Sequence, residues 1–343
     1  MNRKTKYNLA WLVLLIAGTV WILIRHQAPV SYQKDEGFIF GTIYNITYQH
    51  DKSLKEDIEA ELHRFDASLS PFNETSVISR INRNEDVRPD TFFTNVFHRS
   101  EQLSQETEGA FDITVAPLVN AWGFGFKDGV FPDSSMIDSL LRFTGYRKVR
   151  LTPDGRIEKD DPRLMLTCSA VAKGYAVDVV ANLLKRHGIQ NFLVDIGGEV
   201  VVHGTNPQSQ PWRIGINKPV DDSLSVSGEL QTVLHITNAA MATSGNYRNF
   251  YYRDGKKYAH TIDPRTGMPV QHEILSATVI ARDCMSADAY ATAFMVMGLQ
   301  EAIAFAEAHP ELNAYFIYND AEGRMQIYQT QGMKQFLSPP PEK

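Results

Sequence analysis

Apolar side chains recur at helical spacing in some stretches of the chain and gather into β-rich runs in others. Leu54, Ile58, Leu62, Phe65 and Leu69 fall on one helix face, which predicts an amphipathic helix over residues 52–69 with that face in the core. Further helices are predicted over residues 91–106, 170–187 and 300–308, and strands over 38–48, 191–196, 212–216, 230–236 and 274–281. Residues 242–247 are predicted to form a polar turn, and residues 314–329 a hairpin.

The stretch from Cys284 to Gly298 consists mainly of small and apolar residues and is predicted to be a helix that ends at the glycine. Asp288 and Thr292 stand four residues apart, so they lie on one face of this helix. A carboxylate and a hydroxyl in that arrangement offer two hard oxygen ligands to Mg²⁺. The alternative is a buried helix in which Thr292 bonds back to a carbonyl and Asp288 caps or pairs with a neighbour.

The N-terminus has the charge pattern of a membrane anchor. Leu9 to Ile24 is an uncharged apolar run, and three basic residues precede it within the first six positions. We expect an uncleaved, single-pass anchor with its positive end in the cytoplasm and the rest of the chain outside. A cleaved signal peptide and a buried core helix are the alternatives. The expected division is an anchor or signal segment over residues 1–30, a folded domain over 37–335 and a disordered tail over 336–343.

Composition and charge narrow the class of protein further. The 343 residues are 43% hydrophobic and 22% charged, which is ordinary for a folded globular chain. The net charge is −6, so nucleic acid is not an expected partner. Two cysteines, Cys168 and Cys284, cannot make a disulfide framework, and two buried thiols are the favoured interpretation.

Single residues suggest phosphate and proton chemistry without establishing it. Lys173 falls near the first turn of a predicted helix, where a lysine can donate to a phosphate or a flavin carbonyl, although a surface lysine is the commoner case. His260 precedes an Asp-Pro-Arg-Thr-Gly turn and could be a base or a structural residue. The chain carries neither a G-x-G-x-x-G nor a Walker sequence, so a Rossmann or P-loop site is unsupported.

Several short motifs, taken in order, resemble the FAD:protein FMN transferase (ApbE) family. The matching runs are Gly109-Ala-Phe-Asp-Ile-Thr114, Trp122-Gly-Phe-Gly125, Ala172-Lys-Gly-Tyr-Ala-Val-Asp178, Val194-Asp-Ile-Gly-Gly-Glu199, Thr243-Ser-Gly-x-Tyr247, His260-x-Ile-Asp-Pro-x-Thr-Gly267 and Ala287-Asp-Ala-x-Ala-Thr-Ala293. The resemblance implies an α+β, T-fold-like domain with mixed or antiparallel sheets and packed helices, preceded here by one N-terminal membrane helix. It also implies transfer of FMN from FAD to a threonine hydroxyl of another protein, with release of AMP.

Residue by residue, the resemblance implies a complete site. Mg²⁺ is expected on Asp288, Thr292 and the backbone carbonyl of Ala170, and His260 is the expected base for the acceptor hydroxyl. FAD is expected near Phe40, Phe72, Ala110, Phe111, Asp112, Thr167, Lys173 and Ile262. Three of these positions depart from the family pattern, because Thr167 replaces a usual Asp, Phe72 a usual Tyr and Phe40 a usual Met.

The chemistry of the reaction agrees with these residue types. A pyrophosphate needs its charge neutralised, which Mg²⁺ does well, and a threonine hydroxyl needs a base to take its proton. A metal-dependent FAD pyrophosphatase and a membrane-tethered flavin-binding protein without turnover are the alternative functions. The resemblance suggests an exported subunit of a membrane redox complex as acceptor, and thus a domain on the periplasmic side of a bacterial inner membrane. Because Cys168 and Cys284 lie close in sequence to Ala170 and Asp288, a disulfide between them is a further possibility.

Overall fold

An eight-stranded sheet forms the centre of the structure, a computed structural model that describes residues 11–19, 31–125, 131–219, 229–247, 250–253 and 255–337. Its strand order is β1-β2-β5-β6-β9-β12-β13-β14, and every neighbouring pair is antiparallel. The strands are β1 (Tyr32–Ile39), β2 (Thr42–Gln49), β5 (Phe192–Ile196), β6 (Glu199–His203), β9 (Ala239–Gly245), β12 (Ile274–Ala281), β13 (Asn313–Asn319) and β14 (Met325–Gln329). The α+β class with an antiparallel sheet is therefore confirmed.

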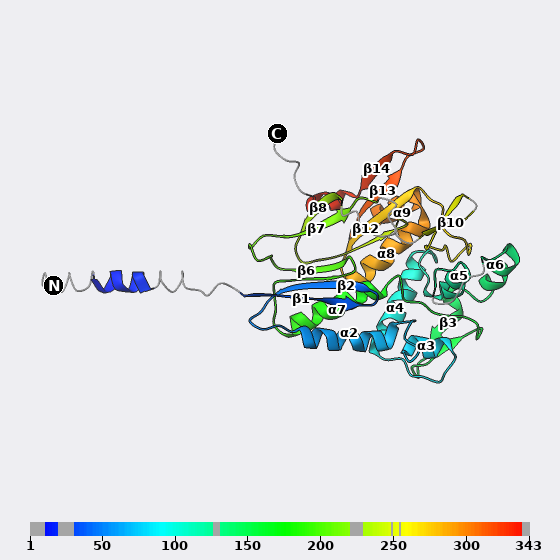
Figure 1. Cartoon of the computed structure of the whole chain (residues 1–343), viewed down its shortest axis with the longest axis horizontal. Coiled ribbons are helices and arrows are strands. Elements are labelled where there is room, and N and C mark those ends of the chain that lie inside the picture. The colour runs from blue at the N-terminus through cyan, green and yellow to red at the C-terminus, as the bar shows by residue number, and fades with distance from the viewer. Residues whose placement is uncertain are drawn as a thin grey trace.

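Helices cover one face of this sheet and enclose the main core (Figure 1). They are α2 (Lys55–Leu69), α4 (Thr91–Glu106), α7 (Ala172–Arg186), α8 (Cys284–Met297) and α9 (Leu299–Ala308). On α2, the predicted stripe from Ile58 to Leu69 is buried against α7 and the sheet. Most residues of helix α8 are small or apolar, and nearly all of them are buried, as expected for a helix inside a core.

A hairpin of β7 (Trp212–Asn217) and β8 (Leu230–Ile236) lies on the other side of the sheet (Figure 1). Together with the 3-10 helix η3 (Gln331–Phe336) it encloses a second core around Trp212, Leu234 and Met333. Leu337 forms a β-bridge with Leu234, so the folded part reaches beyond the predicted end at residue 335. The remainder of the predicted tail, residues 338–343, lies outside the described residues.

Short elements beside the sheet make a third, smaller core around Leu118, Trp122, Ile137 and Ile262. These elements include η1 (Ile113–Val115), α5 (Ala116–Ala121), α6 (Ser134–Leu141), β10 (Phe250–Arg253) and β11 (Lys256–Ala259). The Trp122 indole N–H donates to the carbonyl of Gly267 at 2.8 Å, which joins the α5 end to the turn after β11. The other small elements are α3 (Val77–Asn82), η2 (Tyr146–Lys148), β3 (Val149–Leu151) and β4 (Ile157–Lys159).

Two of the predicted elements within the sheet are wrong. The single strand predicted over residues 38–48 is a hairpin, because Phe40 (φ 52°) and Gly41 (φ 75°) form a two-residue turn with the left-handed backbone that such turns require. The polar turn predicted over 242–247 is largely strand β9, which pairs with β6 and β12 in mid-sheet. Its hydroxyls are satisfied there, since Thr243 Oγ1 bonds Thr278 Oγ1 across the strands at 2.8 Å.

The predicted membrane anchor is described only in part. Residues 11–19 form a helix whose apolar side chains, from Trp11 to Ile16, are exposed, and the rest of the run lies outside the described residues. Within the described ranges, no helix is both long and apolar enough to cross a bilayer.

Both cysteines are free and buried, which confirms the favoured interpretation of two buried thiols over the disulfide. Burial raises the pKa of Cys168 to about 12 and that of Cys284 well above its ordinary value. Since the thiolate is the reactive form, neither side chain presents a nucleophile at neutral pH.

We therefore predict that a thiol reagent such as 5,5′-dithiobis(2-nitrobenzoic acid) reacts with neither cysteine in the native protein at pH 8. After unfolding in guanidinium without reductant, both Cys168 and Cys284 should react. Absorbance at 412 nm measures the released thiolate. A chain that stays unreactive after unfolding, and reacts only once reduced, would contain the disulfide instead.

Candidate active site

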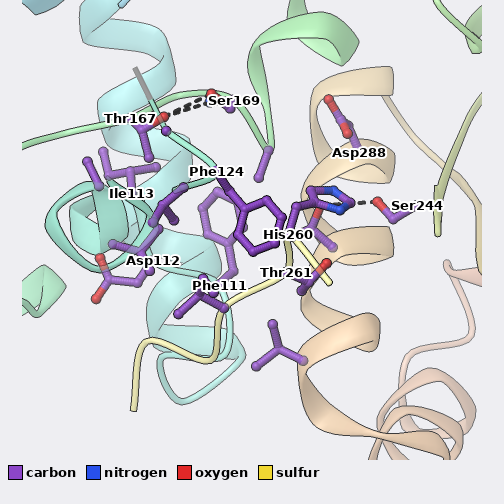
Figure 2. Close-up of a pocket in the computed structure, with 18 of the residues that line it drawn as sticks. Phe111, Asp112, Ile113, Phe124, Thr167, Ser169, Ser244, His260, Thr261 and Asp288 are labelled. Carbon is purple, nitrogen blue, oxygen red and sulfur yellow. Dashed lines mark hydrogen bonds between the residues drawn. The ribbon is translucent and has the colours of Figure 1, made fainter. Parts of the chain in front are cut away.

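A cavity of about 450 Å³ lies where the main core, the third core and the carboxyl end of β9 meet. Its lining comes from segments that are distant in sequence: Phe72 and parts of residues 110–125, 167–173, 197–199, 243–247, 260–264 and 288–296. Figure 2 shows Phe111 and Phe124 on one side of His260, and Ser244 and Asp288 on the other. The aromatic and the charged parts of the cavity are therefore adjacent.

The structure brings nearly all the predicted site residues together in this cavity. Its lining includes Phe72, Ala110, Phe111, Asp112, Thr167, Ala170, Lys173, His260, Ile262, Asp288 and Thr292. Phe40 is the exception: its partly buried ring packs against the outside of the main core, with its centroid 5.5 Å from that of Phe65. The contact between Phe40 and FAD stays a prediction.

Aromatic rings form one wall of the cavity. Phe111 is buried, and Phe124 stacks on Tyr251 with ring centroids 5.0 Å apart. Phe124 also meets the imidazole of His260 edge-on at 6.5 Å. Phe72 lies at the mouth with 76% of its surface exposed, so an apolar ligand that covered it would bury a large area. These rings suit a planar, partly apolar ligand.

Asp112 contributes to the cavity through its backbone rather than its charge. Its carboxylate accepts hydrogen bonds from Thr114 N–H and Thr114 Oγ1, each at 2.7 Å, and from Tyr146 N–H at 2.7 Å. Figure 2 shows this carboxylate pointing away from His260. Burial raises the pKa of Asp112, against the effect of these donors. Asp112 thus fixes the shape of the Ala110–Ile113 loop.

Thr167 is also engaged locally. Its hydroxyl pairs with Ser169 Oγ at 2.9 Å, and its N–H donates to the carbonyl of Ile113 at 2.7 Å (Figure 2). A carboxylate at this position would repel a nearby phosphate, whereas the hydroxyl can donate to one. With threonine in place of the usual Asp, this part of the cavity lining is therefore uncharged and can still form hydrogen bonds.

Asp288 and Thr292 face the cavity from α8, one turn apart. Asp288 is 4% exposed, and its Oδ2 accepts a hydrogen bond from the N–H of Gly174 at 3.0 Å. Burial raises the pKa of Asp288, and the positive charge of Lys173 opposes that shift. Thr292 Oγ1 lies 3.1 Å from Ser244 Oγ on β9. Asp288 and Thr292 together offer a carboxylate and a hydroxyl.

The predicted metal ligands fit a hard cation and not a soft one. In the described residues no group of three or more His, Cys, Asp and Glu side chains is placed to hold a metal ion. One carboxylate, one hydroxyl and the Ala170 carbonyl form an oxygen-only set that leaves room for water, which is how Mg²⁺ is usually held.

An ion pair between a partly exposed lysine and a buried carboxylate lies beside these ligands. Lys173 Nζ, from the first turn of α7, bonds Glu199 Oε1 at the start of β6. Burial alone lowers the pKa of Lys173, but the charges of Glu199 and Asp288 outweigh it and raise that pKa. Burial raises the pKa of Glu199 to about 7, against the attraction of Lys173. Glu199 was not among the predicted site residues, although its motif was recognised.

The turn that carries His260 is held rigidly. Thr261 Oγ1 donates to Asn246 Oδ1 at 2.7 Å, and Ile262 forms a β-bridge with Pro269. The Asp263 carboxylate accepts from the N–H of Arg265 at 2.8 Å, as expected for an Asp-Pro turn. In Figure 2 the imidazole of His260 and the hydroxyl of Ser244 point toward one another. His260 is thus fixed between the aromatic wall and the ligands on α8.

These features define a class of protein: an α+β enzyme whose cavity combines an aromatic wall, a lysine, a histidine and hard oxygen ligands. The profile of the ApbE family matches residues 40–316, and the chain belongs to that family.

Curated relatives and solved structures agree with this assignment. The chain is 37% identical over 340 residues to the FAD:protein FMN transferase of Vibrio cholerae, covering 96% of this chain and 99% of the relative. It is 36% identical over 280 residues to that of Escherichia coli K12, covering 78% and 79%. The structure of the flavin transferase ApbE from Vibrio cholerae matches with a TM-score of 0.80 and 36% identity, over 90% of this chain and 100% of that one. The apo flavinyl transferase ApbE from Pseudomonas stutzeri matches at 0.79 and 31% identity, over 90% and 98%.

Proposed function

We propose that this chain transfers FMN from FAD to a threonine hydroxyl of an acceptor protein, forming a phosphoester and releasing AMP, in a reaction that requires Mg²⁺. Transfer of FMN from FAD to a protein is the activity named for the relatives that it matches over most of its length. The observation that carries the finer proposal is the convergence of Lys173, His260, Asp288 and Thr292 on one cavity with an aromatic wall.

The flavin ring and the pyrophosphate of FAD suit different parts of this cavity. The isoalloxazine ring is apolar and planar, so it suits the wall of Phe111 and Phe124 and the exposed ring of Phe72. The pyrophosphate then reaches Lys173, whose ammonium neutralises part of its charge. Ile262 and the Ala110–Ile113 loop complete the enclosure.

The residues on α8 and at Ala170 are those that would hold Mg²⁺. When bound, Mg²⁺ neutralises phosphoryl oxygens and favours an in-line geometry. Asp288 is anchored by Gly174 N–H and Thr292 by Ser244, so both oxygens are preorganised. Burial of the Asp288 carboxylate, which disfavours its charge, is compensated by a cation at that position.

His260 acts as the base in the transfer step. The threonine oxygen forms a bond to the phosphorus of the FMN phosphate, the bond from that phosphorus to the bridging oxygen breaks, and AMP leaves with that oxygen. The hydroxyl proton goes to the imidazole of His260, because histidine is the side chain that most readily takes up a proton near neutral pH. Ser244 and Phe124 hold the ring from opposite sides.

We further propose that the apolar run at Leu9–Ile24 anchors the chain in a bacterial inner membrane, with the domain over residues 37–335 on the periplasmic side. The exposed apolar side chains of residues 11–16 support this, because such a helix gains free energy by entering lipid. The acceptor is then an exported subunit of a membrane redox complex. An alkaline phosphatase fused after residue 40 should be active in cells, whereas activity of a β-galactosidase fused there would contradict this topology.

Removing the charge of Asp288 tests the metal assignment. We expect Asp288→Asn to lower FMN transfer at least about hundredfold at saturating FAD, because a neutral amide is a poor ligand for Mg²⁺. The amide oxygen can still accept from Gly174 N–H, so the thermal unfolding temperature should change little. Initial rates over a range of Mg²⁺ concentrations measure the effect. A variant with near-normal rates at low Mg²⁺ would show that the metal is bound elsewhere.

Replacing His260 tests the base. His260→Gln keeps size and hydrogen bonding but cannot accept the proton, so we expect transfer to fall about 10²–10⁴-fold while FAD affinity stays near that of the parent. The matched control is His63→Gln, on the exposed face of α2, which should leave both quantities unchanged. FAD binding is followed by flavin fluorescence and transfer by flavin retained on the denatured acceptor. Transfer by His260→Gln within about threefold of the parent rate would end the assignment.

A further inference from the structure

Lys173 lies close to two carboxylates and is bonded to only one of them. Its Nζ pairs with Oε1 of Glu199, which is 3% exposed. The second oxygen of that carboxylate, Oε2, is buried and has no hydrogen-bond partner in the described part of the chain. Burying a carboxylate oxygen without a hydrogen-bond partner costs free energy, so the position of Glu199 at the cavity wall calls for a functional reason.

The other carboxylate is Asp288, and its attachment brings it next to the same lysine. Asp288 Oδ2 is bonded to the N–H of Gly174, which directly follows Lys173 in α7. No side-chain ion pair between Lys173 and Asp288 occurs in the described structure, although the two charges attract one another. A lysine has a flexible four-carbon stem, so an ammonium released from Glu199 can turn to Asp288. It would then neutralise the very oxygen atoms that the metal needs.

We propose that Glu199 is a positioning residue that holds the Lys173 ammonium away from Asp288, and thereby keeps the Asp288 carboxylate available for a divalent cation. This inference rests on the proposed metal site. It gives the Glu199–Lys173 ion pair a role in metal binding although neither residue contacts the metal. It also explains why one lysine can serve the pyrophosphate beside a carboxylate that binds Mg²⁺.

The fold fixes Glu199 for this task. Gly197 (φ 68°) and Gly198 (φ 103°) form the tight turn between β5 and β6, in backbone conformations that other residues rarely adopt. Glu199 follows them as the first residue of β6 and pairs in register with Ile196. The carboxylate is thus presented from a mid-sheet strand, opposite the first turn of α7, and cannot follow the lysine if it moves.

A double-mutant cycle on metal binding separates this role from simple charge loss. The full-length chain in detergent, free of FAD, is titrated with Mn²⁺, and free Mn²⁺ is measured by electron paramagnetic resonance. We expect Glu199→Gln to weaken Mn²⁺ binding about tenfold or more, in the range typical of residues that support metal ligands. In a Lys173→Met background, the same Glu199→Gln change should have almost no effect, because no ammonium is left to occupy Asp288.

Two outcomes would overturn the inference. Glu199→Gln could bind Mn²⁺ as tightly as the parent, or it could weaken binding equally with and without Lys173, which is the result expected from direct charge loss. The matched control is Asp195→Asn, which removes a nearby carboxylate whose Oδ1 accepts from Gly198 N–H instead of from the lysine. The Mn²⁺ affinity of this control should stay within about threefold of that of the parent. If Glu199→Gln does not fold, Glu199→Asp takes its place in the cycle. Glu199→Asp should also weaken Mn²⁺ binding, and this weakening should again disappear in the Lys173→Met background.

The same titration keeps the inference distinct from the proposed function. Asp288→Ala should abolish the tight Mn²⁺ site in every background. If the parent binds no Mn²⁺, or Asp288→Ala binds it normally, the proposed metal site is wrong and the inference falls with it. If binding depends on Asp288 but the Glu199 effect does not depend on Lys173, only the role of Glu199 is wrong.

Discussion

The site depends on one close contact, between the first turn of α7 and the first half of α8. A Cβ at Gly174 would lie 2.2 Å from the carbonyl oxygen of Cys284, so only glycine allows this approach. Asp178, one turn further along α7, accepts from the N–H groups of Cys284 and Met285 at 3.0 and 2.8 Å and caps α8. In the other direction, Asp288 on α8 accepts a hydrogen bond from the N–H of Gly174 on α7. Small residues thus let the two helices pack closely enough to bring the Asp288 carboxylate against the first turn of α7, which also carries Lys173.

This packing concentrates charge in a place where charge is costly. Asp288 and Glu199 are both almost fully buried, and only Lys173 is bonded to either of them among the described cations. Burial raises the pKa of both carboxyl groups, because burial disfavours their charged forms. Under the proposed function, a divalent cation at Asp288 would offset this cost and would also neutralise part of the charge of the FAD pyrophosphate.

Much of this arrangement could be predicted from the sequence, and the parts that could not have physical reasons. Helices α2 and α8 follow from local pattern, and the pairing of Asp288 with Thr292 follows from helical spacing. Strand β9 was misread because its Thr-Ser-Gly run is typical of turns, while cross-strand pairing with Thr278 satisfies its hydroxyls only in the folded sheet. Phe40 is assigned to the site by resemblance alone, and the hairpin turn that places its partly buried ring against Phe65 has no clear local signal in the sequence. Glu199 and Lys173 are 26 residues apart, so no local pattern could reveal their ion pair.

The most direct test of this account is the fate of flavin and AMP when the full-length chain is incubated with FAD, Mg²⁺ and an exported threonine-containing redox subunit. The intact mass of the denatured acceptor and the amount of AMP are measured together. The account predicts that the acceptor gains one FMN with loss of water, that AMP appears in equal amount, and that an acceptor with valine in place of the threonine gains nothing. AMP and free FMN without any flavin on the denatured acceptor would contradict it, because water rather than threonine would then be the attacking group.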